Sequence, residues 1–117
     1  MRNFVFFRDV QAGVQHISEP VNFDQRVSWE LFIESSGLNG VPKFFIEQAS
    51  TGSKCISPTE WTVYKSRCSS DGSFDLDEAL VTIEKNDFKT NWFRVRFEPN
   101  GNTEGFISAR ISYKTFP

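Results

Sequence analysis

The search for catalytic chemistry starts with the histidine and the cysteines, because these side chains serve most often as bases, nucleophiles and metal ligands. The chain has one histidine, His16, and two cysteines, Cys55 and Cys68. A catalytic triad would need His16 as its base. His16 lies in the strand-like stretch Val14-Gln15-His16-Ile17, and we interpret it as an ordinary strand histidine. Two cysteines and one histidine are too few for a structural zinc site, and no Cys-x-x-Cys motif is present.

The acidic residues gather once, in the turn over residues 71–77 and the adjoining Glu78. Asp71, Asp75, Asp77 and Glu78 form this acidic cluster, and loops between strands often bind Ca²⁺ through carboxylate and carbonyl oxygens. The EF-hand pattern fails, since Leu76 stands where its invariant glycine would be. We interpret this segment as a solvated turn, with a Ca²⁺ site as the alternative. Neither a marked carboxylate pair, a phosphate loop nor a nucleophile elbow is present, so we expect no enzyme and no cofactor.

Arginines supply the next candidates for binding. Arg94, Arg96 and Arg110 are expected to form a cluster on the polar face of a single hairpin, predicted below over residues 91–114. Guanidinium groups bind phosphates, acidic sugars and the carboxylates of protein partners. Pairing with Glu98 and Glu104 across neighbouring strands is the simpler interpretation, and we favour it.

Aromatic residues out of phase with the apolar face of their strand predict an exposed binding surface. Trp92 directly precedes Phe93, the first of the alternating apolar residues of its strand, so its side chain is expected on the opposite face. Phe32 is out of phase with Leu31 and Ile33 in the same way, and Phe45 adds further apolar surface. A small domain with aromatic side chains outside its core usually covers them with a partner, which favours protein contacts over sugar stacking. The candidate contacts for a protein partner or a glycan are Trp61, Tyr64, Trp92, Arg94, Arg96 and Phe32.

The elements that must position these side chains are strands, because apolar residues recur at every second position. The alternating sets are Val27, Trp29, Leu31 and Ile33, then Phe93, Val95 and Phe97, then Ile107, Ala109, Ile111 and Tyr113. Each set predicts a strand with one wet face, which implies antiparallel sheets. Further strands are expected at residues 43–48, 61–64 and 80–83, and at 4–7 on a sheet edge or against a neighbouring subunit. Phe44, Ile46, Val81 and Ile83 complete the predicted core.

Turn residues divide these strands. Asn100-Gly101-Asn102 separates two alternating strands and predicts a hairpin over residues 91–114. Gly37-Leu38-Asn39-Gly40 links the strand at 26–34 to the next one. Residues 75–80 could start a helix with acidic residues in its first turn, but the β-branched run Val81-Thr82-Ile83 follows at once, so we allow at most one helical turn there.

Length and composition lead to a single fold class. One domain over residues 1–117 is expected, since two cores would each be too small. Thirteen phenylalanines favour sheet over helix. Seven to nine short strands predict an all-β, antiparallel β-sandwich of jelly-roll or discoidin-like type.

Net charge and hydropathy limit the classes of partner that the protein can be expected to bind. A net charge of −2 argues against nucleic acid and against a polybasic membrane surface. No apolar run reaches the ~20 residues of a transmembrane helix. Residues 1–9 do not have the pattern of a signal peptide, so we expect free thiols at Cys55 and Cys68. A disulfide between neighbouring strands is the alternative.

The order of strands and turns from Val27 to Lys114 carries a family resemblance. The residues concerned are Val27-Ser28-Trp29-Glu30-Leu31-Phe32-Ile33-Glu34, Phe45-Ile46-Glu47-Gln48-Ala49-Ser50-Thr51-Gly52, Trp61-Thr62-Val63-Tyr64, Trp92-Phe93-Arg94-Val95-Arg96-Phe97 and Gly105-Phe106-Ile107-Ser108-Ala109-Arg110-Ile111-Ser112-Tyr113-Lys114. This pattern resembles the small, discoidin-like β-sandwich proteins of bacteriophage and virus particles. Thr51-Gly52 replaces the usual Asp-Gly turn, and residues 55–59 form an insertion.

The resemblance implies a non-enzymatic virion structural protein, such as a minor capsid, decoration, spike-base or tail component. Its implied partners are copies of itself, as a homo-oligomer, and other virion proteins, in a particle assembled in the host cytoplasm. We then expect the Phe-rich N-terminal segment to pack on a neighbour. The alternative is a carbohydrate-binding β-sandwich module, since sugar-binding discoidin-like domains share the pattern.

Overall fold

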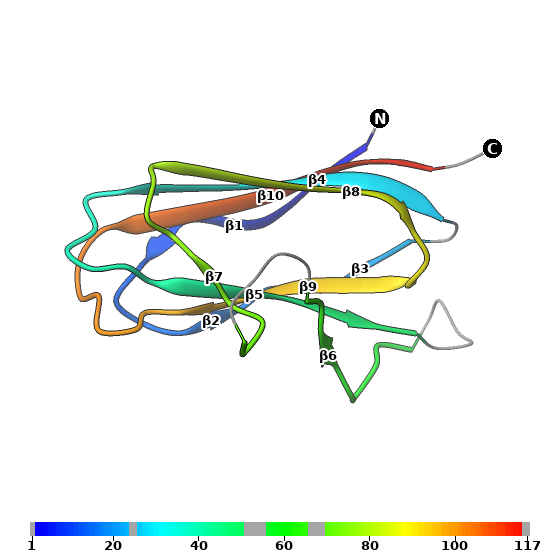
Figure 1. Cartoon of the computed structure of the whole chain (residues 1–117), viewed down its shortest axis with the longest axis horizontal. Helices are drawn as coiled ribbons and strands as arrows, with labels where there is room; N and C mark the ends of the chain where they lie inside the picture. Colours follow the sequence, from blue (N-terminus) through cyan, green and yellow to red (C-terminus); the bar gives the residue numbers. More distant parts are fainter. Residues whose placement is uncertain (1, 24–25, 51–55, 66–69, 116–117) are drawn as a thin grey trace.

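The computed structural model describes residues 2–23, 26–50, 56–65 and 70–115, and this part of the chain contains strands but no helix (Figure 1). The strands are β1 (Arg2–Gln11), β2 (His16–Ile17), β3 (Val21–Asn22), β4 (Val27–Ser36), β5 (Lys43–Ala49), β6 (Thr62–Val63), β7 (Phe74–Asp75), β8 (Leu80–Phe88), β9 (Trp92–Glu98) and β10 (Phe106–Thr115). The predicted all-β class is confirmed. Ten strands are described instead of seven to nine because four short pairings add to the six long strands.

Two antiparallel sheets pack face to face as a sandwich (Figure 1). Sheet A has the strand order β1-β10-β4-β8. Sheet B has the order β2-β9-β5-β6, with β3 also paired to β9 and β7 also paired to β5. The connections β1–β2, β4–β5, β7–β8 and β9–β10 pass from one sheet to the other, and all four lie at the same end of the molecule, on the left in Figure 1.

The core lies between the two sheets and is formed mainly by the alternating apolar residues that the sequence analysis assigned to it. Twelve of the predicted core residues are buried, and Val81, Ile83 and Tyr113 pack against them partly exposed. The sequence analysis missed a further set of buried residues: Phe6, Phe7, Ala12, Val21, Phe23, Leu76 and Phe88. Several of these lie in short or irregular strands, where no period of two is visible.

The hairpin predicted over residues 91–114 is wrong, because β9 lies in sheet B and β10 in sheet A. The turn itself exists: Asn100 and Gly101 have positive φ values of 51° and 87°, and the Asn102 N–H donates to the Pro99 carbonyl at 3.0 Å. The turn redirects the chain across the sandwich instead of back along the same sheet. The two strands therefore turn their apolar faces toward each other through the core, and their polar faces lie on opposite surfaces.

The N-terminal segment is a strand at a sheet edge, and it belongs to its own chain's fold. β1 pairs with β10 over its whole length, with register shifts between Val5 and Phe7 and between Phe7 and Val10. The first shift lets the adjacent Phe6 and Phe7 both enter the core, where they are 8% and 7% exposed. The sheet-edge alternative is thus confirmed, and the expected packing of this segment on a neighbouring subunit stays a prediction.

The ambiguous segment over residues 75–80 contains no helical turn. Its centre is held by Leu76, which is 2% exposed and whose N–H donates to the Pro42 carbonyl at 2.9 Å. The β-branched run that follows begins β8. Cys55 and Cys68, together with the Thr51-Gly52 turn, lie outside the described residues, so the thiol expectation stays a prediction.

Candidate functional site

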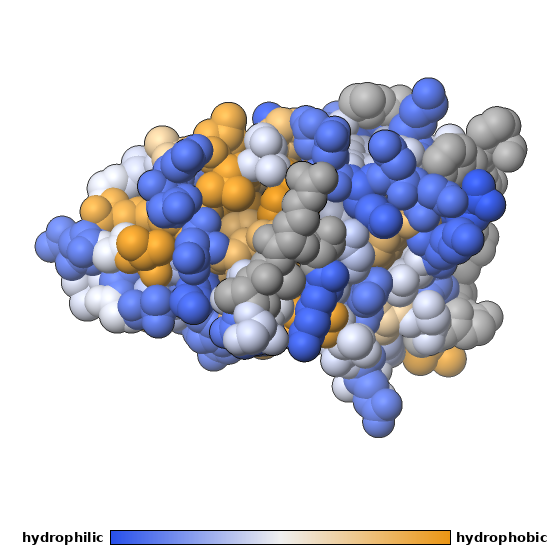
Figure 2. Space-filling model, in the orientation of Figure 1, coloured by the Kyte–Doolittle hydropathy of each residue, from blue (hydrophilic) through white to orange (hydrophobic). Residues whose placement is uncertain are grey.

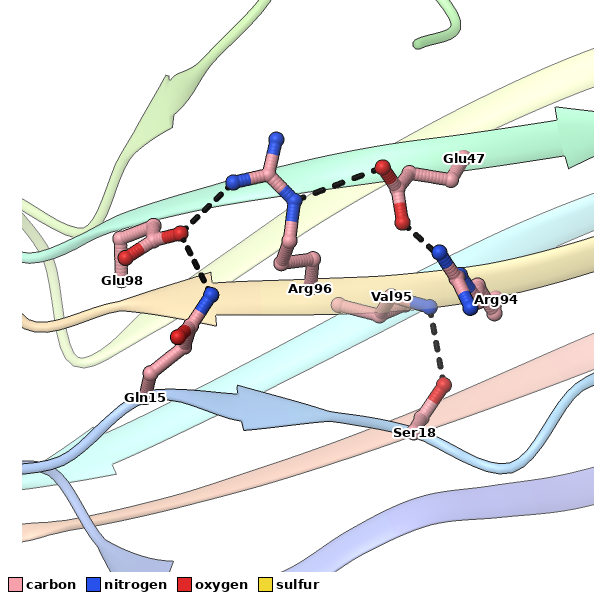
Figure 3. A network of polar contacts seen from close by, with 7 residues as sticks. All are labelled: Gln15, Ser18, Glu47, Arg94, Val95, Arg96 and Glu98. Atoms are coloured by element: carbon pink, nitrogen blue, oxygen red, sulfur yellow. Dashed lines mark hydrogen bonds and ion pairs between the residues drawn. The ribbon is translucent and has the colours of Figure 1, made fainter. Parts of the chain in front are cut away.

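The outer face of sheet B carries a buried carboxylate between two arginines. Glu47 on β5 lies opposite Arg94 on β9 and is only 7% exposed. Arg94 Nε donates to Glu47 Oε1 at 2.8 Å, and Arg96 Nε approaches Glu47 Oε2 at 3.4 Å (Figure 3). One carboxylate thus satisfies both guanidinium groups. The sequence analysis did not single out Glu47, because nothing in the strand pattern distinguishes a buried glutamate from an exposed one.

The same network continues toward the end of β9. Arg96 Nη1 donates to Glu98 Oε1 at 2.6 Å, and Gln15 Nε2 donates to the same oxygen at 2.9 Å (Figure 3). The favoured interpretation that acidic partners pair with these arginines holds for Glu98. Glu98, however, lies two residues along the same strand and not across from Arg96.

Each arginine of this network also covers an aromatic ring. The Arg94 guanidinium carbon lies 4.2 Å from the centre of the Trp61 ring, and that of Arg96 lies 4.0 Å from the centre of Phe45. Such stacking is a favourable cation–π contact. It also occupies the ring face on which a sugar would stack, so neither Trp61 nor Phe45 presents an open platform on that side.

Two of the candidate aromatic contacts pack against other rings or are buried. Tyr64 is partly exposed, with its ring centre 6.0 Å from Trp29 and 5.8 Å from Phe88. Trp92 lies outside the core cluster, as its phase predicted, but is only 7% exposed. The expectation of exposed binding surface is therefore wrong for Trp92, and Tyr64 stays a candidate with part of its surface open.

Phe32 lies on the other surface of the molecule, the outer face of sheet A. Arg110 on β10 is its cross-strand partner, with the guanidinium carbon 4.1 Å from the centre of the ring. Arg110 is thereby separated from Arg94 and Arg96 by the thickness of the sandwich. The proposed cluster of three arginines does not form, because its existence depended on the hairpin.

A hollow of about 370 Å³ opens beside Phe32, between β1, β10 and β4. It is lined by Val5, Phe7, Arg8, Asp9, Phe32, Glu34, Ser108, Ala109 and Arg110. Apart from Phe32 and Arg110, none of these residues was a candidate from the sequence. The hollow lies where β1 departs from regular pairing, and a bulge of this kind leaves no signal in the periodicity.

His16 and the acidic turn make contacts that fit structural roles. His16 Nε2 lies 2.7 Å from the Gln11 carbonyl oxygen, and its ring contacts Phe7 and Phe97. Asp71 Oδ1 accepts hydrogen bonds from the backbone N–H and the hydroxyl of Ser73, at 3.0 and 2.6 Å. Over residues 2–23, 26–50, 56–65 and 70–115, no three side chains of His, Cys, Asp or Glu gather as a metal site would need.

The fold and these surfaces define an all-β antiparallel sandwich whose outer faces carry arginines stacked on aromatic rings. No known family model and no curated protein sequence matches the chain. Within the described part of the chain there is no helix of the length and hydropathy that a membrane span requires.

Proposed function

We propose that the protein is a non-enzymatic structural protein that acts by assembling with other protein chains. The observation that carries this proposal is the apolar surface at the end of the sandwich where the strands change sheets. Val41 is 46% exposed there, Leu38 is partly exposed in the same hollow, and Leu80 is 48% exposed at the start of β8. Figure 2 shows apolar surface gathered at this end and along the adjoining side of the molecule. Contiguous exposed apolar surface favours contact with another protein.

The shape of this end supports the same proposal. A hollow of about 370 Å³ lies between residues 35–41 and residues 76–79, so the loops present a concave surface. Its wall includes the buried Leu76, while Asp77 and Glu78 are exposed at its margin. An apolar centre with a charged margin is the usual composition of a protein interface.

We further propose that the assembly is a virus or bacteriophage particle, in which this chain is a minor capsid, decoration, spike-base or tail component. Its partners would be copies of itself and other virion proteins. The strand-and-turn pattern from Val27 to Lys114 supports this, together with a sandwich fold that displays two broad polar faces. In a closed ring of identical subunits, each contact between neighbouring subunits would bury the apolar end of one of them.

Light scattering of the purified chain over a tenfold concentration range tests the assembly. We expect a homo-oligomer whose mass falls when the apolar end is made polar, in the double variant Val41→Ser/Leu80→Ser. The matched control is Ile17→Ser, since Ile17 is 52% exposed on the opposite edge, in β2. A wild-type monomer at every concentration, or equal masses for the double variant and the wild type, would contradict the proposal.

A further inference from the structure

We propose that the outer face of sheet A binds an extended carbohydrate chain, a role beyond the proposed assembly. The first observation is a row of three adjoining hollows in this face, which together we call the trough. The hollow beside Phe32 shares Asp9, Glu34 and Ser108 with a smaller hollow of about 120 Å³, which continues toward Phe106. In the other direction it shares Phe32 and Arg110 with a hollow of about 300 Å³, which continues toward Lys114.

The trough follows β10 from Phe106 to Lys114. At about 3.3 Å per residue this distance is roughly 25 Å, which suits several linked sugar rings better than one small ligand. Its lining residues occupy alternate positions on β10 and β4, on the side opposite the core. Phe106 lies opposite Ser36, Ser108 opposite Glu34, and Arg110 opposite Phe32.

The charged groups of the trough do not form ion pairs with one another. Across the described ranges, no ion pair joins Arg8, Arg110 or Lys114 to a carboxylate of this face. The outer face of sheet B is the contrast, since Glu47 there pairs with two arginines. The cationic groups on sheet A therefore remain available to a ligand.

The balance of charges selects the class of ligand. The acids of the trough are Asp9, Glu30, Glu34 and Glu84, and the cations are Arg8, Arg110 and Lys114. A polyanion would meet the carboxylates and a polycation the guanidinium groups. Sugar hydroxyls each donate and accept a hydrogen bond, so a neutral polyhydroxylated chain can use both kinds of group.

One cross-strand pair supports this reading of the acids. Glu30 on β4 lies directly opposite Glu84 on β8. Like charges at opposed positions destabilise a sheet, so the pair is unfavourable in the free protein. Hydroxyl donors placed between the two carboxylates would relieve that repulsion.

One aromatic ring supplies an open apolar contact at one end of the trough. Phe106 is 49% exposed there. Arg110 covers Phe32 near the middle of the trough, so that ring is not open on the side of the guanidinium group. The C–H face of a sugar ring can pack against Phe106, while Arg110 donates to hydroxyls farther along the sugar chain.

The irregular course of β1 holds the Asp9 carboxylate at the trough. Asp9 has a φ of 47°, in the left-handed region that aspartate adopts more readily than most non-glycine residues. Its N–H donates to Ser108 Oγ at 2.9 Å, and the Ser108 hydroxyl donates back to Asp9 Oδ1 at 3.2 Å. These two hydrogen bonds fix the position of the carboxylate beside β10.

An array of immobilised neutral and acidic glycans, followed by titration calorimetry of its hits, tests the proposal. We expect binding to neutral oligosaccharides of several residues. Asp9→Asn, Glu34→Gln and Phe106→Ala should each weaken the affinity at least tenfold. Asparagine tolerates the positive φ of Asp9 and keeps an oxygen for the Ser108 hydroxyl, so this variant should fold. Asp75→Asn, an exposed change on sheet B, is the matched control and should bind like the wild type.

Two outcomes would overturn the carbohydrate site. One is the absence of binding to every glycan on the array. The other is binding that survives all three trough variants and is lost in Trp61→Ala, which would place the sugar on sheet B. If the trough variants instead lower the oligomer mass without any sugar binding, this face is a protein interface. Leu80 lies opposite Glu34 on β4, so the single variant Val41→Ser, which lies outside the trough, tests the assembly separately, and either proposal can fail alone.

Discussion

The backbone N–H of Gly40 donates a 2.9 Å hydrogen bond to the side-chain Oδ1 of Asn102, a residue that is 1% exposed. The N–H of Asn39 donates to the same oxygen at 2.9 Å. Asn102 Nδ2 donates in turn to the carbonyls of Ala12 and Glu104, at 3.0 and 2.7 Å. One buried amide therefore joins the β1–β2, β4–β5 and β9–β10 connections, and it fixes the end of the sandwich at which the chain changes sheets.

Replacing Asn102 by alanine should destabilise the protein by about 2–4 kcal/mol. The substitution leaves two N–H groups and two carbonyls without their partner; the bond to the Ala12 carbonyl is buried and the other three are partly buried, and each lost partner is costly. The free energy of unfolding in urea measures the loss. Asn3→Ala, an exposed change on β1, should stay within about 0.5 kcal/mol of the wild type. Equal unfolding midpoints for the two variants would contradict the role of Asn102.

Gly105 and Gly101 form a matched pair that separates backbone strain from close packing. Both have positive φ, 95° and 87°. A Cβ on Gly105 would clash with the Ser36 carbonyl oxygen and lie 2.8 Å from the carbonyl carbon of Gly37, whereas a Cβ on Gly101 meets nothing within 4 Å. We expect Gly101→Ala to cost about 1 kcal/mol from the left-handed conformation alone. Gly105→Ala should cost at least about 2 kcal/mol more in thermal or urea unfolding. Equal losses would mean that the backbones can separate freely.

The fold was predictable from the sequence wherever alternation ran through a long, regular strand. Trp29 and Leu31 on β4, and Ile107 and Ile111 on β10, are buried as their phase required. The hairpin failed for a physical reason. Two strands that pair side by side and two that face each other across a core have the same period of two, and a turn such as Asn100-Gly101 can serve either arrangement.

The candidate site was less predictable, because the position of a residue in the alternation of its strand shows which face of the sheet it lies on, but not which other side chains cover it. Trp92 is on the predicted side of its strand and is still buried. Trp61 is covered by Arg94, which approaches from a strand distant in the sequence. The trough on sheet A depends on the irregular pairing at Asp9, and no local pattern announces a bulge.

Removing the Glu47 carboxylate should cost more than breaking an exposed ion pair. Glu47→Ala leaves Arg94 and Arg96, whose side chains are about a quarter exposed, without their shared partner. We expect a loss of about 1–3 kcal/mol, since water still reaches the arginines in part. The control is Asp87→Asn, which breaks the exposed pair with Arg26 and keeps a residue that tolerates the positive φ of 57°. Its effect should stay below about 1 kcal/mol. A larger loss for Asp87→Asn than for Glu47→Ala in urea unfolding would contradict this ranking.

Substituting Phe6 tests whether the N-terminal strand belongs to its own fold or to a neighbour. Phe6 is 8% exposed, and its ring centre lies 5.6 Å from Phe93 and 5.2 Å from Phe4. Phe6→Ala should therefore lower the free energy of unfolding by about 3–4 kcal/mol through lost burial and a cavity. Val5→Ala, next to it but 44% exposed, should cost less than about 1 kcal/mol. If Phe6→Ala keeps the wild-type unfolding midpoint and instead reduces the oligomer mass, the segment packs on a neighbouring subunit, and the β1–β10 pairing within one chain is not its state in solution.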